Sequence, residues 1–501
     1  LRGDDEFALI DPREEGDFAH GHLLSASNLP FSRLELLIGD AVPGRSTPIV
    51  LVDDLSGPAE RAATLLSELG YSDVSILMGG VAAWHVSGFA LFSGVNVPGK
   101  AFGEWVEYHL RPPAISAEAL KDRLDANDPI LLIDTRTPEE HADDCIPGAL
   151  LCPNGELPVR ALAMIADRNT TVVAHCAGRT RSIIGAQTLI DLGVSQPVFA
   201  LENGTVGWEE IGAELERGAH RPLPLTDDSR DAGRDSTARL VRSAGLAEIT
   251  METLAEMQAD LERTIILLDV RTCEEFCAGH VPGARNVPGG QLIQNIDKAA
   301  IVKNSRIVLT DDDGARITLV AFWLKRMGFG DVHMLPTAPD DRTQQGVAAR
   351  EIGTVDDEVL HLSDAELVVD IRSSLAYRRG HVPGSWFLSR ANLERDLANL
   401  PAPGPIAVIA DDAAYAELMA RDLRLSDFQP FVVLDGFETW KAAGGAIETG
   451  FTRLASPPND MWYDGEHLQH AADAARENRR YIAWEKALID DIVGEPSVRY
   501  L

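Results

Sequence analysis

The sequence is short of basic residues. Its 501 residues include 45 Lys and Arg against 78 Asp and Glu, which gives a formal net charge of −33. A nucleic-acid groove or an anionic membrane surface needs clustered Lys and Arg, so we expect no nucleic acid and no membrane as partners. No apolar run reaches the roughly 18 residues that a membrane-spanning helix needs.

Cysteine is also scarce. Five cysteines in 501 residues are too few for a disulfide scaffold, and an odd number without metal-type pairs is typical of reduced thiols. The 13 histidines are scattered, and no His, Cys or carboxylate spacing resembles a ligand set, so we expect no metal and no cofactor. The first residues show no signal-peptide pattern. We therefore expect a cytoplasmic protein.

What the sequence does contain is a repeat. Four segments share an opening phrase in which an apolar run ends in Asp-x-Arg. Such a run predicts a buried strand of parallel type with a polar carboxyl end. The phrases read FALIDPREE from Phe7, LLIDTRTPEE from Leu131, ILLDVRTCEE from Ile266 and LVVDIRSSLAY from Leu367.

Three more phrases follow in each unit. The second is a Gly- and Pro-containing turn before a short strand, as in GHVPGARNVP from Gly279. The third is an apolar strand that enters a loop and a helix, as in TVVAHCAGRTRSIIGAQTLI from Thr171. The fourth strand ends in Gly and Trp four residues apart, at Gly80, Gly204 and Gly436, whereas repeat three has MLPTAPDD instead. Units of roughly 100 residues with this order predict βα units around a parallel sheet.

The repeats predict the domain organisation. We expect four α/β domains, each a small parallel sheet flanked by helices, followed by a helical tail. The predicted ranges are residues 1–94, 114–219, 246–350 and 355–450 for the repeats and 451–501 for the tail. Segments 95–113 and 221–239 read as linkers. Segments 115–124, 249–261 and 466–492 read as helices, the first two with Ser or Thr starts, and the tail helix is expected to pack on a repeat.

One loop carries the candidate chemistry. In repeat two the strand at 170–175 leads into Cys176, and Gly178, Arg179 and Arg181 follow as a helix opens. Unpaired N–H groups and the positive end of the helix dipole meet there, and two arginines add positive charge. We therefore expect the pKa of Cys176 to lie below the free value of ~8.5. Gly178 permits a tight anion nest.

The other three repeats and the other four cysteines lack the features of the Cys176 loop. At the position of Cys176 the other repeats have Asp53 or Asp54, Asp311 and Asp411, so we expect them to be inactive. Cys145 and Cys152 read as structural, in a turn and in the strand after it. Cys273 and Cys277 read as half-buried residues on one helix face.

Together these motifs resemble the rhodanese family over nearly all of residues 1–450. The resemblance implies a sulfurtransferase in which Cys176 takes sulfane sulfur from an anionic donor, as a persulfide, and passes it to cyanide or a thiol. It also assigns roles to the neighbouring residues. The N–H groups from Ala177 through Gly178, Arg179 and Thr180 to Arg181 would cradle the persulfide, Arg179 and Arg181 would bind the donor sulfonate, Asp134 and Arg136 would order the loop or its rim, and Ser182 would cap the helix.

Two departures from the family pattern leave the donor open. Gly178 comes one place earlier than in the commonest family loop, and Cys145 replaces the usual His of its turn. Two loop arginines favour thiosulfate over 3-mercaptopyruvate. The acceptor stays open among cyanide, glutathione, thioredoxin and a protein cysteine, and so does the oligomeric state.

Two other functions remain as alternatives. A cysteine phosphatase of the same fold would show a similar His-Cys pattern, but four residues separate Cys176 from Arg181, one fewer than such phosphatases have. A narrower loop fits sulfur better than phosphate. A non-catalytic sulfur-sensing or scaffold protein is the other alternative, because three repeats lack the nucleophile. We expect those repeats to form interfaces and channel walls, with one and two arranged against three and four.

Overall fold

The structure is a computed structural model. It describes residues 3, 5–166, 170–346, 362, 365–401, 403–463, 471–495 and 497–501. The predicted boundary between repeats three and four at 350–355 lies outside these residues, and so do residues 466–470 at the start of the predicted tail helix.

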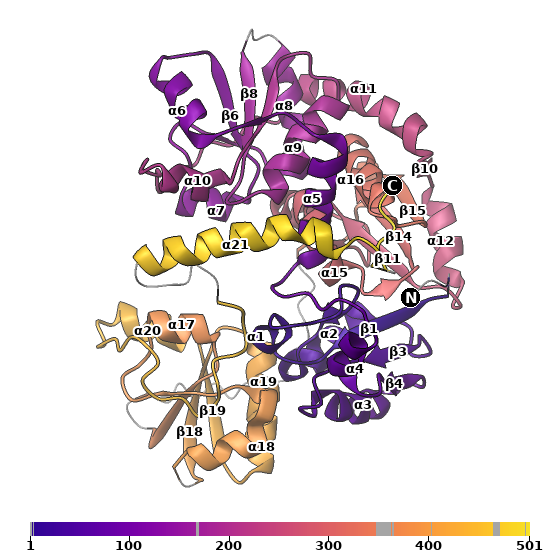
Figure 1. The fold of residues 1–501 in the computed structure, drawn as a ribbon. Helices are drawn as coiled ribbons and strands as arrows, with labels where there is room; N and C mark the ends of the chain where they lie inside the picture. Colours follow the sequence, from indigo (N-terminus) through magenta and orange to yellow (C-terminus); the bar gives the residue numbers. More distant parts are fainter. Residues whose placement is uncertain are drawn as a thin grey trace. The chain divides into compact units, whose positions relative to one another are not determined.

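Each repeat contains a parallel sheet, as the sequence predicts (Figure 1). The apolar runs form central strands that are buried along their length, because helices cover both faces of the sheet. In repeat two the strand order is β5-β9-β8-β6-β7, and in repeat three it is β10-β15-β14-β11-β12. In each repeat the Asp-x-Arg strand is central and pairs with the strand that carries the third phrase.

Repeats two and three contain similar sets of elements. The strands of repeat two are β5 (Ala114–Ile115), β6 (Ile130–Asp134), β7 (Leu150–Leu151), β8 (Thr171–His175) and β9 (Val198–Leu201), and its helices are α6 (Ala117–Asp125), α7 (Pro138–Asp143), α8 (Leu157–Ala166), α9 (Thr180–Asp191) and α10 (Gly204–Glu210). The strands of repeat three are β10 (Ala247–Glu248), β11 (Ile265–Asp269), β12 (Arg285–Asn286), β13 (Val302–Lys303), β14 (Arg306–Asp311) and β15 (Val332–Pro336), and its helices are α12 (Met251–Ala259), α13 (Cys273–Ala278), α14 (Gly289–Gln294), α15 (Ile296–Ala299) and α16 (Ala315–Arg326).

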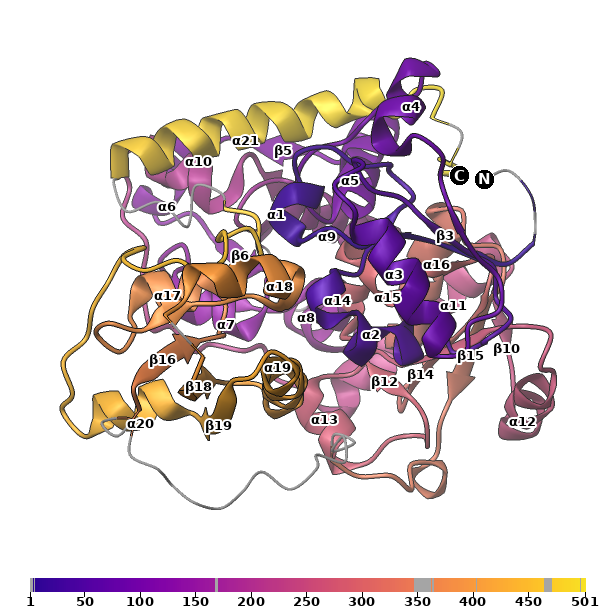
Figure 2. The same ribbon diagram turned by 90° about the horizontal axis from the view of Figure 1, so that it is seen from below.

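Repeats one and four are smaller, and Figure 2 shows α19 of repeat four beside its strands. The elements of repeat one are β1 (Phe7–Asp11), β2 (Ser27–Asn28), β3 (Ile49–Leu51), β4 (Val74–Ile76), α1 (Glu15–Phe18), α2 (Leu34–Ala41), α3 (Pro58–Glu68) and α4 (Gly80–Val86). Those of repeat four are β16 (Leu367–Asp370), β17 (Trp386–Phe387), β18 (Pro405–Ala410), β19 (Gln429–Leu434), α17 (Ser374–Arg379), α18 (Leu393–Asp396), α19 (Ala413–Leu425) and α20 (Gly436–Ala442).

The repeats group differently from the sequence prediction. One compact unit holds repeats two and three with residues 464–501, and the other holds repeats one and four. The predicted arrangement of one and two against three and four is therefore wrong. Within the first unit a single apolar core runs through both repeats. Trp323 of α16 is fully buried in that core and donates from its indole nitrogen to Thr188 of α9 at 3.0 Å.

The two segments predicted to be linkers, 95–113 and 221–239, contain helices, so that prediction is wrong. Helix α5 (Val97–Leu110) begins with Pro98 in its first turn, and α11 (Asp227–Ala244) begins with a capping box between Thr226 and Ser229. Helix α11 packs on α8 and α16, while α5 packs on α9. The predicted helices at 115–124 and 249–261 are confirmed as α6 and α12, with side-chain caps from Ser116 and Thr250.

The described part of the predicted tail helix is confirmed as α21 (Ala471–Asp491). It belongs to the first unit and lies against α5 and α10 (Figure 1). Both of these helices flank the loop after β8. Three helices therefore meet at that loop: α10 of repeat two itself, and α5 and α21 from outside the repeat.

Candidate active site

Cys176 begins the loop between β8 and α9, and we call residues 176–181, which include the first two residues of α9, the Cys176 loop. The side chain of Cys176 is only 2% exposed. The backbone of α10 holds the loop in place: Thr205 donates its N–H to the carbonyl of Cys176 at 2.8 Å, and Val206 donates to that of Ala177 at 3.1 Å.

The backbone at Gly204 shows why the Gly-x-x-x-Trp motif of the fourth phrase needs its glycine. Its φ of +52° lies in the left-handed region, and a Cβ there would stand 2.2 Å from the carbonyl oxygen of Cys176. No other residue type permits this approach. In repeat one a Cβ on Gly80 would meet the carbonyl oxygen of Asp53 at 2.1 Å. Because this position is glycine, the last helix of the repeat can pack against the backbone of the loop.

Arg179 points to the acidic side of α5. Its guanidinium donates to the two carboxylate oxygens of Glu104 at 2.8 and 2.9 Å and also pairs with Glu107. Burial raises the pKa of Glu104 to about 7, although the hydrogen bonds and charge of Arg179 act in the opposite direction. One of the two loop arginines is therefore already bound to carboxylates.

Arg181 forms a second ion pair within repeat two. Its guanidinium donates to both oxygens of Glu140 at 2.6 and 2.7 Å, a two-point geometry suited to arginine. Glu140 is itself fixed, because it completes the capping box of α7 with Thr137. Of the two loop arginines, Arg181 is the one whose charge favours the thiolate of Cys176.

Thr180 and Ser182 lie in the first turn of α9. The hydroxyl of Thr180 donates to Glu485 of α21 at 2.5 Å. Ser182 donates its hydroxyl to the carbonyl of Arg179 at 2.7 Å, and its donor groups act to lower the pKa of Cys176. Ser182 therefore does not occupy the N-cap position, which Arg179 holds without a side-chain cap.

The expectation of a lowered Cys176 pKa is wrong for this structure. Burial raises the pKa of Cys176; the charge of Arg181 and the hydrogen bonds of Ser182 oppose this rise, and Glu485 adds to it. The loop geometry favours a thiolate, but the side chain is buried away from the water that would stabilise one.

Asp134 and Arg136 form a buried framework beside the loop. Their side chains are joined by hydrogen bonds of 2.9 to 3.3 Å, and His141 contacts Asp134 at 3.0 Å. Burial acts against the carboxylate, yet His175, His141 and Arg136 hold the pKa of Asp134 below its usual range. The same Asp–Arg pair occurs in the other three repeats.

Repeat one shows what the loop binds when it has no cysteine. The strand register and the contact with Gly80 place Asp53, rather than Asp54, at the position of Cys176. Its carboxylate accepts the backbone N–H of Ala59 at 3.1 Å. Ala59 is the sixth residue after Asp53, as Ser182 is after Cys176. The residue at this position therefore acts on a carboxylate in one repeat and on a sulfur in the other.

Repeat three repeats this arrangement. Asp311 stands at the Cys176 position and accepts N–H groups from Gly314 at 2.9 Å and Ile317 at 3.1 Å, although burial and the neighbouring Asp313 raise the pKa of its carboxyl. A carboxyl group fills the cradle in both repeats, which leaves no nucleophile there.

Repeat four requires a correction. The pairing of Asp370 with Ile409 places Ala410, not Asp411, at the position of Cys176. Asp412 instead caps α19 by accepting the N–H of Tyr415 at 3.0 Å. The sequence of β18 alone could not show which residue stands at the Cys176 position, because Asp411 and Asp412 follow directly after Ala410.

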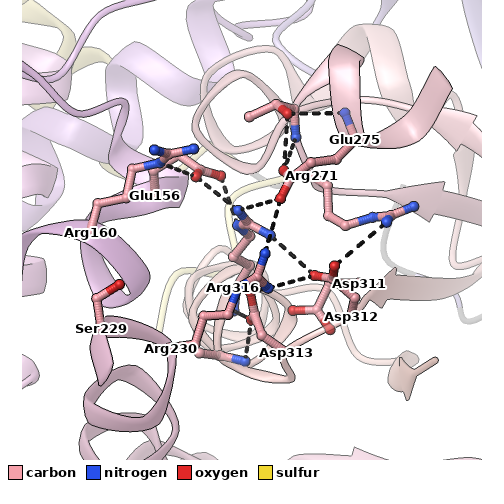
Figure 3. A network of polar contacts seen from close by, with 12 residues as sticks. Glu156, Arg160, Ser229, Arg230, Arg271, Glu275, Asp311, Asp312, Asp313 and Arg316 are labelled. Atoms are coloured by element: carbon pink, nitrogen blue, oxygen red, sulfur yellow. Dashed lines mark hydrogen bonds and ion pairs between the residues drawn. The ribbon is translucent and has the colours of Figure 1, made fainter. Parts of the chain in front are cut away.

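The arginine that corresponds to Arg181 links repeats two and three. Arg316 is fully buried and pairs with Glu275 of its own repeat at 3.1 Å and with Glu156 of repeat two at 2.8 Å (Figure 3). Asp313 lies 3.1 Å from the same guanidinium. In repeat three this position therefore contributes to the interface between the repeats.

The remaining cysteines differ from Cys176. Cys145 and Cys152 are buried, and burial raises the pKa of Cys145 to about 11. Cys273 and Cys277 do share the face of α13, with sulfurs 3.9 Å apart, but Cys273 is exposed rather than half-buried. Over the described part of the chain, no group of three or more His, Cys, Asp or Glu could hold a metal ion, and no helix is long and apolar enough to cross a membrane.

Four carboxylates at the loop escaped the sequence analysis: Glu104, Glu107, Glu140 and Glu485. Only Glu140 carried a local signal, because Thr-x-x-Glu at a helix start is a capping-box pattern. The other three lie on helices about 70 or 300 positions away along the chain. No spacing rule could place them beside Cys176.

The fold and this loop define a class of protein, and comparisons with known proteins agree. The rhodanese-like domain family matches residues 1–87, 116–211, 250–337 and 355–443, more than half of the chain. The chain therefore belongs to the rhodanese family, with four such domains, as the sequence motifs predict. It is similar to the crystal structure of a thiosulfate sulfurtransferase from Pseudomonas aeruginosa, with 36% identity, a TM-score of 0.91, and coverage of 99% of this chain and 97% of that one.

Single-domain relatives match smaller parts of the chain. A sulfurtransferase from Allochromatium vinosum is 35% identical over 101 residues, which is 20% of this chain and 92% of that protein. The thiosulfate sulfurtransferase GlpE from Shewanella oneidensis is 36% identical over 77 residues, 15% of this chain and 74% of that protein.

Proposed function

We propose that the protein is a thiosulfate sulfurtransferase in which Cys176 carries the transferred sulfur. The observation that carries the proposal is the cradle around Cys176. Ser182, whose donor groups lower the pKa of Cys176, stands at the position of Ala59 and Ile317, whose N–H groups bind the Asp53 and Asp311 carboxyl groups in the other repeats. A site that accommodates a carboxyl group suits the outer sulfur of a persulfide, which is anionic.

The reaction divides into two half-reactions. The thiol of Cys176 loses its proton to water, and the thiolate attacks the outer sulfur of thiosulfate. The new S–S bond forms as the bond to the sulfonate sulfur breaks, and sulfite leaves with that electron pair. In the second half-reaction an acceptor such as cyanide or a thiolate attacks the outer sulfur, and Cys176 leaves as thiolate. This sequence predicts ping-pong kinetics.

The arginines have separate roles in the proposal. Arg181 favours the anionic sulfur because its charge acts on Cys176. Arg179 binds the donor sulfonate only after it leaves Glu104 or Glu107. Asp134 and Arg136 hold the end of β6 beside the loop. A small anionic donor and a thiophilic acceptor are the partners, and a reducing cytoplasm would keep Cys176 as a free thiol.

A donor-by-acceptor activity screen with the Cys176→Ser variant as control tests this proposal. Thiosulfate with cyanide should give thiocyanate in the unaltered protein and none above background in the variant. Hydrolysis of p-nitrophenyl phosphate in the same preparations tests the phosphatase alternative. Sulfur transfer that survives in the variant would remove Cys176 from the mechanism, and inactivity with every donor would favour a scaffold or sensor.

A further inference from the structure

Helix α21 covers the Cys176 loop at its glycine. A Cβ added to Gly178 would lie 3.4 Å from the end of the Ile482 side chain, 3.5 Å from Oε2 of Glu485 and 3.6 Å from the ring of Tyr481. These are ordinary van der Waals distances, so α21 packs directly on the loop. The ammonium of Lys100 on α5 also faces the Tyr481 ring, 5.0 Å from its centre.

Glu485 is the charged residue of this contact. It is 1% exposed, and one carboxylate oxygen accepts the hydroxyl of Thr180 at 2.5 Å. The other oxygen, Oε2, is buried and has no hydrogen-bond partner among the described residues. A buried carboxylate oxygen without a partner is costly. If α21 only packed on the loop, an apolar side chain at position 485 would serve equally well.

Of the three helices at the loop, α21 makes the fewest hydrogen bonds to it among the described residues. Helix α10 belongs to the repeat itself and bonds to the loop backbone through Thr205. Helix α5 is held by the two-point pair between Glu104 and Arg179. Within the part of the chain that the structure describes, helix α21 accepts one hydrogen bond from the loop, from Thr180, and its side chains lie within van der Waals distance of where a Cβ on Gly178 would stand. The side of the loop that Glu485 covers is therefore the side with the fewest polar contacts to break.

We propose that Glu485 is a specificity-determining residue of the Cys176 site: its carboxylate stands in the approach of an anionic sulfur donor and must move aside before that donor reaches Cys176. This inference rests on the proposed sulfur-transfer function. A negative charge in the approach repels a dianion more strongly than a monoanion, because the Coulomb energy scales with the ligand charge. Repulsive elements of this kind are a common source of specificity.

Glu485→Gln tests the proposal, because it keeps the size of the side chain and an oxygen for Thr180 but removes the charge. The KM for thiosulfate should fall about threefold or more, with kcat changed less than about twofold, since the charge opposes donor binding. Methanethiosulfonate, a donor with one charge fewer, should show a smaller change. Asp490→Asn, an exposed site on the same helix, should behave like the unaltered protein, and Glu485→Asp should retain the discrimination.

Alkylation of Cys176 provides a second readout that needs no sulfur transfer. Glu485→Gln should raise the rate with anionic iodoacetate more than the rate with neutral iodoacetamide, and Asp490→Asn should leave that ratio unchanged. Equal effects on both reagents and both donors, or no effect on any, would overturn the role of Glu485. If the alkylation ratio shifts but thiosulfate never loads Cys176 in the unaltered protein, the sulfur-transfer function fails and the role of Glu485 stands.

Discussion

Glu104 of α5 and Arg179 of the Cys176 loop form a buried two-point ion pair, with N–O distances of 2.8 and 2.9 Å. Glu104 is only 3% exposed. The pair fastens a helix from outside the rhodanese repeat to the loop that carries the nucleophile. It also binds the guanidinium of Arg179, to which the sequence motif assigns the binding of the donor sulfonate.

The first prediction concerns the pH dependence of this pair. Burial raises the pKa of Glu104 from 4.5 to about 7, so the folded protein binds more protons than the unfolded chain between these values. The stability from Glu104 is complete below pH 4.5 and is lost as the pH rises through 7. Compared with Glu104→Gln, the unaltered protein should lose on the order of 1–3 kcal/mol between pH 5 and 8.

Unfolding midpoints of both proteins at pH 5 and pH 8 measure this difference. Glu118→Gln, an exposed change on α6, serves as control and should show little pH-dependent difference. If the advantage of the unaltered protein over Glu104→Gln grows with pH, the attraction of Arg179 outweighs burial and the expected direction is wrong.

The second prediction concerns the thiol of Cys176. Because burial raises its pKa, the thiolate fraction should keep rising through pH 9. The rate of alkylation by iodoacetamide, followed by mass on the Cys176 peptide, should therefore climb over the range from pH 6 to 9 without levelling off. A plateau already reached at pH 7 would show a stabilised thiolate, as the sequence alone predicts.

The third prediction separates the two loop arginines. The charge of Arg181 opposes the rise in the pKa of Cys176 that burial causes, whereas the guanidinium of Arg179 is bound to Glu104 and Glu107. Arg181→Gln should raise the pKa of Cys176 further and lower kcat/KM for thiosulfate by roughly 10-fold or more, the scale of a charge contact in a buried site. Arg179→Gln should leave the alkylation profile unchanged. The reverse order of effects on alkylation would contradict the geometry.

The fourth prediction concerns the interface between repeats two and three. Arg316→Met removes a fully buried guanidinium that pairs with Glu156 and Asp313. Glu156 then keeps only its pair with Arg160, and Asp313 only its pair with Arg230, among the described residues. Breaking such a pair from one side costs about 3–5 kcal/mol, so the thermal midpoint should fall clearly. Arg234→Met, which removes an exposed ion pair with Asp231, should change stability by less than about 1 kcal/mol. Similar small shifts in both variants would show that the Arg316 cluster does not stabilise the unit.

The sequence predicts the repeated fold well because its signals are local. Each Asp-x-Arg phrase ends a buried strand, and the strands at Asp134 and Asp269 pair in the same register with their neighbours. Ser116 and Thr250 begin helices as their side-chain chemistry requires. The cysteine at the carboxyl end of β8 follows from the same kind of local pattern.

The surroundings of Cys176 depend on contacts that are distant in sequence. Glu104 and Glu485 reach the loop from helices that pack by tertiary contact, one in a segment read as a linker and the other in the tail. Glu485 adds to the rise in the pKa of Cys176 that burial causes. The grouping of repeats two with three likewise depends on side chains such as Arg316, whose partner in the other repeat no local pattern reveals.

The most direct test of the sulfur-carrying role of Cys176 is the mass of its peptide after treatment with thiosulfate. The peptide should gain one sulfur atom, about 32 Da, as expected for a covalent intermediate, and lose it again when cyanide is added. The peptides with Cys145, Cys152, Cys273 and Cys277 should gain nothing. Sulfur on the exposed Cys273 instead, or thiocyanate formation without any gain at Cys176, would contradict this role.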